Sequence, residues 1–133
     1  MSGQTNLTVL LKSMKPMKVE GEFVFIAVKN GQYGQLQQLR PKAMFIEEEG
    51  MTLVIPKKLA EQHGYPYASI FTCITLTVHS SLDAVGLTAA FTNKLKEKGI
   101  SANVIAGFYH DHIFVHTEKS EQALAALNEF NAA

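Results

Sequence analysis

Hydrophobic positions in the second half of the chain follow two different periods. Between Ile70 and His79, apolar residues largely alternate with threonines, and a period of two is typical of a half-buried strand. From Val85 to Lys98, apolar residues recur every three or four positions, which predicts a helix with one buried face. This predicted stripe consists of Leu87, Ala90, Phe91 and Leu95. Gly99 is expected to end the helix as a left-handed cap.

The remainder of this half predicts a hairpin and a closing helix. Residues 103–108 and 113–116 are strand-like, and residues 109–112 predict the turn between them. A last helix is expected to begin near Thr117 or Ser120. Strand, helix, strand, strand, helix is the order of a ferredoxin-like βαββαβ unit without its final strand. We expect the N-terminal half to supply that strand.

The first half of the chain repeats this order in a degenerate form. Its pattern predicts a helix over 7–14, a buried strand over 23–28, an irregular stretch over 29–42, a hairpin over 44–55 and a short helix over 57–63. Gly64 and Pro66 then interrupt any regular element. We therefore predict an α+β protein of two tandem units, 1–66 and 67–133. Each unit is expected to have an antiparallel sheet with helices on one face.

Composition excludes several classes of protein. Of 133 residues, 47% are hydrophobic and 18% are charged, which excludes a disordered chain. The net charge is zero and Arg40 is the one arginine, so a basic patch for nucleic acid is not expected. No apolar stretch is long enough to cross a membrane, and no secretory signal is visible. With Cys73 as the single cysteine, we expect a cytoplasmic protein.

Three short motifs carry a resemblance to a known family. Asp83-Ala84-Val85-Gly86-Leu87 precedes the predicted helix, Gly99-Ile100 follows it, and the last helix contains Ala123-Leu124. In this order the motifs resemble the ACT domain, the amino-acid-sensing module of many biosynthetic regulators. The family has proline where this chain has Val85. More closely, the whole chain is similar to short bacterial proteins made of two tandem ACT-type units, most distinctively over residues 75–82 and 107–115.

The resemblance implies an amino-acid site between paired modules, held largely by backbone groups, and a homodimer or higher homo-oligomer. The residues themselves are compatible with such a site, because a helix start exposes about four unpaired N–H groups and a partial positive charge. Gly86 would let a carboxylate approach them closely. The predicted ligand-binding residues are Ser81, Asp83, Ala84, Val85, Gly86, Leu87 and Asn103. Alternatively, Ser81 or Asp83 only caps the helix and Gly86 only allows close packing.

Histidines suggest a second candidate site at the predicted hairpin turn. His110 and His112 could ligate a metal with His79 or His116 as a third ligand, or could hydrogen-bond a ligand or a partner subunit. A turn need not keep the two imidazoles on one side, so we expect no metal and no cofactor. Cys73 is expected to be a buried, inert thiol, since His79 lies about 20 Å away along the same strand.

These observations favour a non-enzymatic module that binds a small molecule, with amino acids as the implied ligand class. No phosphate-binding loop, nucleophile elbow or pair of catalytic carboxylates is visible, so no catalytic residue is assigned. Two alternatives remain open. One is an adaptor that has lost its ligand, as Val85 in place of proline suggests. The other is a metal or thiol enzyme that uses His110, His112 and Cys73.

Overall fold

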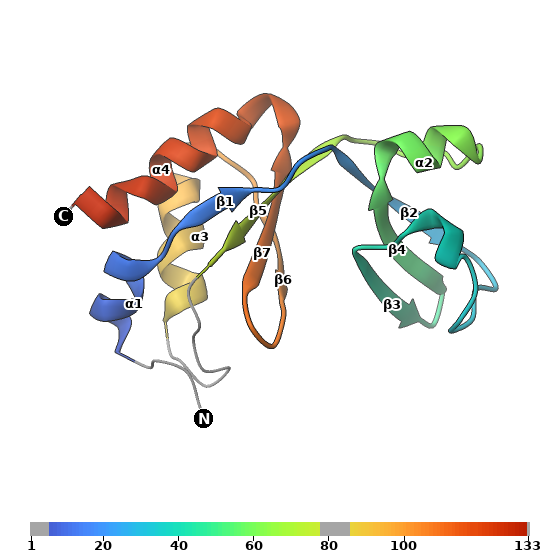
Figure 1. Cartoon of the computed structure of the whole chain (residues 1–133), viewed down its shortest axis with the longest axis horizontal. Coiled ribbons are helices and arrows are strands. Elements are labelled where there is room, and N and C mark those ends of the chain that lie inside the picture. Colours follow the sequence, from blue (N-terminus) through green and yellow to red (C-terminus); the bar gives the residue numbers. More distant parts are fainter. Residues whose placement is uncertain (1–5, 78–85, 133) are drawn as a thin grey trace. The chain divides into compact units, whose positions relative to one another are not determined.

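The computed structural model describes residues 6–77 and 86–132, and it contains two compact units (Figure 1). The inserted unit comprises Glu20–Phe71. The split unit comprises Met1–Val19 together with Thr72–Ala133. This grouping differs from the predicted division after residue 66, because residues 7–18 pack and pair with the second half of the chain. The order of the elements nevertheless gives both units the predicted ferredoxin-like, antiparallel α+β character.

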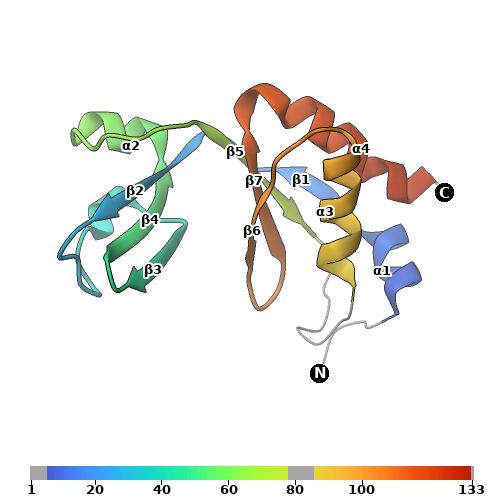
Figure 2. The ribbon, with the colours of Figure 1, turned by 180° about the vertical axis from the view of Figure 1, so that it is seen from behind.

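Among the described residues, the split unit has four strands, in the order β1-β5-β7-β6 (Figure 2). These strands are β1 (Pro16–Lys18), β5 (Phe71–Leu76), β6 (Asn103–Ala106) and β7 (Asp111–His116). Because β1 pairs antiparallel with β5, the chain start supplies the strand that the ferredoxin-like order lacks at its end. The expectation that the N-terminal half provides this strand is confirmed, although residues 16–18 carry no strand pattern of their own.

Three helices cover one face of that sheet: α1 (Leu7–Ser13), α3 (Leu87–Glu97) and α4 (Ser120–Ala132). The predicted stripe of α3 is buried at Leu87, Phe91 and Leu95. These side chains share one core with Ile74 and Leu76 of β5, which lie two positions apart on the strand and therefore face the same side of the sheet. Other buried members of this core are Leu10, Met14, Ile100, Ile113, Val115, Ala123, Ala126 and Leu127.

The inserted unit is built around the hairpin of β3 (Ala43–Glu47) and β4 (Gly50–Pro56). β4 also pairs with β2 (Phe23–Val28), and α2 (Lys57–Gln62) follows it. Residue Phe71 of β5 pairs with Phe23, so the inserted unit ends where the main part of β5 begins. A stretch with one 3₁₀ turn at Gln37–Leu39 stands where the split unit has α3, as expected for a degenerate copy. Its core is formed by Val24, Ile26, Leu39, Met51, Leu53, Ile55 and Ala60.

Candidate functional site

The candidate ligand site lies at the start of α3. Gly86 is the residue before the helix and has φ +91°, a backbone conformation that favours glycine. Its carbonyl accepts the first helical bond, from the N–H of Ala90 at 2.9 Å. No side chain in the described part of the chain caps this helix. The first turn therefore presents the N–H groups of Leu87, Thr88 and Ala89, which lie too early in the helix to have an intrahelical acceptor and for which no described side chain is a capping partner.

The helix α1 packs directly against this position. A Cβ on Gly86 would lie 3.3 Å from Cδ2 of Leu7, the first residue of α1. Gly86 thus has two structural reasons to be glycine: its positive φ and the close approach of Leu7. The sequence could not reveal this neighbour, because Leu7 is 79 positions away along the chain. Leu7 narrows the approach to the helix start and provides an apolar wall beside it.

Several predicted site residues cannot be placed. Ser81, Asp83, Ala84 and Val85 lie outside the described residues, as does His79. The Leu87 side chain is buried at 4% exposure, so its backbone N–H is the group that it can offer. Asn103 opens β6, where its Nδ2 donates to the carbonyl of Phe114 across the hairpin at 3.4 Å. This amide therefore supports the β6–β7 pairing.

A shallow, open hollow of about 600 Å³ lies along the outer side of α3. It begins at Ala89, three residues after Gly86, and ends at Ala102, one residue before Asn103. Its polar groups come from Thr92, Asn93, Lys96 and Ser101. Sequence reasoning missed this surface. The signal was a second stripe on α3, with Ala89, Asn93 and Lys96 spaced at helical intervals opposite the buried residues.

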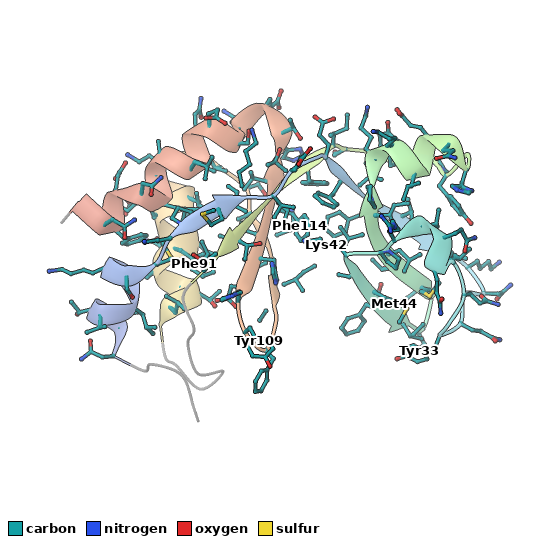
Figure 3. All side chains as sticks on the ribbon, in the orientation of Figure 1. Tyr33, Lys42, Met44, Phe91, Tyr109 and Phe114 are labelled. Carbon is teal, nitrogen blue, oxygen red and sulfur yellow. The ribbon has the colours of Figure 1, made fainter. Side chains whose placement is uncertain are left out.

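The hairpin histidines are placed differently from the prediction. The turn spans 107–110, where the N–H of Gly107 donates to the carbonyl of His110 at 2.9 Å, so Asp111 and His112 belong to β7. His112 Nδ1 lies 3.0 Å from Oγ1 of Thr75 on β5. His110 Nδ1 is buried and has no hydrogen-bond partner among the described residues. The His110 imidazole thus belongs to the turn, whereas the His112 imidazole belongs to strand β7. Tyr109 projects from the tip of this hairpin (Figure 3).

Metal-ligating groups do not converge in the described part of the chain. Residues 6–77 and 86–132 contain no cluster of three or more histidine, cysteine, aspartate or glutamate side chains that could hold a metal ion. Cys73 is fully buried in β5. No helix within these residues has the length and apolar character required to cross a membrane.

Burial raises the pKa of Asp111, while the neighbouring His112 and His110 oppose this shift. A raised pKa in the folded state means that ionised Asp111 costs stability at neutral pH, and that the cost disappears as pH falls through the raised pKa. We expect Asp111→Asn to raise the melting temperature at pH 7 by roughly 2–3 °C. Thermal unfolding at pH 7 and near pH 4 checks this, since the difference should shrink at the lower pH. A melting-temperature difference between Asp111→Asn and the wild type that grows at the lower pH would contradict a raised pKa of Asp111.

Family models for the ACT domain match residues 2–72 and 69–129. The chain therefore belongs to the ACT domain family, with two domains in tandem, as the motifs predict. No curated protein matches it significantly.

Solved structures extend this result. A protein of unknown function from Vibrio cholerae is 55% identical in sequence to this chain, and the two structures have a TM-score of 0.86. The match covers 94% of this chain and 95% of that protein. The regulatory subunit of aspartate kinase from Thermus flavus has the same fold, with 9% identity, 87% and 96% of the two chains covered and a TM-score of 0.64. Aspartokinase III of E. coli, in complex with aspartate and ADP, is 10% identical to this chain and has a TM-score of 0.64. The match covers 93% of this chain and 34% of the aspartokinase chain.

Proposed function

We propose that this protein is a non-enzymatic regulatory module that binds an amino acid at the start of α3. The observation that carries the proposal is the helix start at Gly86, where three backbone N–H groups follow a residue without a side chain. A ligand carboxylate would accept from these groups and would be favoured by the helix dipole. Its side chain would extend into the hollow between Ala89 and Ala102, where Asn93, Lys96 and Ser101 offer polar contacts.

Family membership supports this ligand class. Two of the similar structures are aspartate kinase proteins, one of them a regulatory subunit and the other bound to aspartate. We include in the proposal the self-association that the ACT resemblance implies, as a homodimer or a higher homo-oligomer. A ligand that binds one assembly better than another would shift the population toward it, and this is how occupancy would be transmitted to a regulated partner.

Thermal unfolding of the full chain with individual amino acids tests the binding. A ligand at one hundred times its dissociation constant stabilises the protein by about 2.7 kcal/mol. The test variant is Gly86→Ala. The matched control is Gly64→Ala, just after α2, where φ is also positive at +75° and a Cβ would meet no atom within 4 Å. Both substitutions should cost about 1–2 kcal/mol through backbone strain, and only Gly86→Ala should lose the response to ligand.

A specific observation favours a second candidate, an adaptor without a ligand. Leu7 lies beside Gly86, and its packing accounts for the glycine without any bound molecule. An adaptor would show no stabilisation by any of the amino acids, in the wild type or in either variant. A response retained equally by Gly86→Ala and Gly64→Ala would instead establish binding at another site and overturn the placement at α3.

A further inference from the structure

Three lysines at the C-terminal end of α3 have different surroundings. Lys94 Nζ lies 3.2 Å from Oε1 of Glu129 on α4, and Lys98 Nζ lies 3.2 Å from Oε2 of the same carboxylate. Lys96 is exposed and has no acidic partner among the residues that the structure describes. It is instead one of the residues that line the hollow along α3. The Lys96 charge is therefore available to a group from outside the chain.

The polar groups of this hollow differ in the hydrogen bonds that they can still make. The Thr92 hydroxyl donates to a carbonyl one turn earlier in α3 at 2.7 Å, so it can only accept a further bond. Asn93 Nδ2 donates to Oε2 of Glu97 at 3.3 Å. Lys96 and Ser101 donate to no residue in the described ranges, 6–77 and 86–132. The end of the hollow formed by Lys96 and Ser101 therefore suits a carboxylate, which only accepts hydrogen bonds and carries negative charge.

The spacing along α3 determines which ligand can reach this end of the hollow. Lys96 follows Ala89 by seven residues, which is about 10 Å along a helix. Side chains on a helix tilt toward its N-terminus, so the flexible lysine stem shortens this distance. A ligand whose α-carboxylate accepts from the N–H groups of the first turn would then direct its side chain toward the Lys96 ammonium. Glutamate has one methylene more than aspartate and therefore spans more of this distance.

We propose that the hollow along α3 selects an acidic amino acid, with glutamate preferred, and that Lys96 and Ser101 bind its side-chain carboxylate. This inference rests on the proposed function, because it assigns a ligand class to the same site. Glutamine has nearly the same shape as glutamate, but its side-chain amide carries no charge and presents N–H groups to the donors of Lys96 and Ser101. The site therefore distinguishes an acid from its amide, and this difference is measurable.

Isothermal titration calorimetry of the full chain with glutamate, glutamine, aspartate and asparagine tests this inference. Each acid and its amide have nearly the same size, so the comparison isolates the contribution of the side-chain charge. Glutamate should bind roughly fivefold more tightly than glutamine, as expected for a charge pair at an exposed position. Raising the ionic strength should reduce this ratio, because salt screens an exposed pair of charges.

Lys96→Gln removes the charge from the hollow, and Lys98→Gln is its matched control. The control makes the same change two residues away, at a lysine that is bound to Glu129 and does not line the hollow. Lys96→Gln should bring the affinities for glutamate and glutamine together, whereas Lys98→Gln should preserve the ratio of the wild type. Both lysines are exposed, so both variants should fold like the wild type, and thermal unfolding without ligand checks this.

The possible failures of this inference and of the proposed function give different results. A wild type that binds a neutral amino acid as tightly as glutamate, or more tightly, would overturn the acidic ligand class without bearing on amino-acid binding itself. A preference for glutamate that survives Lys96→Gln would overturn the role of Lys96. A chain that binds none of the standard amino acids would overturn the proposed function, and this inference with it.

Discussion

Deleting residues 1–19 is expected to prevent the split unit from folding. These residues form α1 and β1, and they place Leu10 and Met14, both with 0% exposure, in the core of that unit. The deletion also removes the partner of β5, because Pro16–Lys18 pairs with Ile74–Leu76. Two lost core side chains cost about 2–5 kcal/mol each, and the sheet loses an edge strand in addition. Since small domains are stable by about 5–15 kcal/mol, this loss is enough to unfold the unit.

Circular dichroism and urea unfolding of the truncated chain check this prediction. Leu10→Ala isolates the packing contribution and should cost about 2–5 kcal/mol. Lys12→Ala, an exposed position on the same helix, should change stability by less than about 0.5 kcal/mol. A truncated chain that keeps the cooperative unfolding and midpoint of the full protein would show that α1 and β1 are not part of the folded unit.

Phe91→Ala is expected to be the most destabilising single substitution in α3. Phe91 has 0% exposure and lies in the centre of the buried stripe (Figure 3), between Leu87 and Leu95. Removing a buried aromatic ring loses its transfer free energy and leaves a cavity, which together cost about 3–5 kcal/mol. Urea unfolding should show this as a lower midpoint. Thr88→Ala, exposed on the same helix, should stay within about 0.5 kcal/mol of the wild type, and equal effects of the two substitutions would contradict the orientation of α3.

Local pattern predicts most elements of this fold, because their signals lie in neighbouring residues. The strand over Phe23–Val28 and the hairpin closed near Gly50 occur where period and turn residues place them. The strand β1 has no such signal. Three residues are too short for a period, and β1 is stabilised by pairing with Ile74–Leu76, far along the chain. Pro16 marks the end of α1 in the sequence, but nothing local shows that the chain then joins a sheet.

The same distinction between local signals and long-range contacts applies to the candidate site. The loop motif indicates Gly86 as a candidate, but no pattern in the sequence predicts its positive φ. The contact with Leu7 and the hollow beside Lys96 depend on packing between distant segments, and no spacing in the sequence encodes them. The hairpin turn was misplaced because Asp111 is a common turn residue. Gly107 permits the tighter turn over 107–110, as a Cβ there would lie 2.9 Å from the His110 carbonyl oxygen.

Backbone amide chemical shifts measured during titration with single amino acids test the central claim most directly. If a carboxylate binds at the start of α3, the ¹H–¹⁵N signals of Leu87, Thr88 and Ala89 should move together with one dissociation constant, while those of α2 in the inserted unit stay in place. Gly86→Ala should abolish these shifts and Gly64→Ala should preserve them. An amino acid that stabilises the protein yet leaves these three signals unmoved would contradict the proposed site.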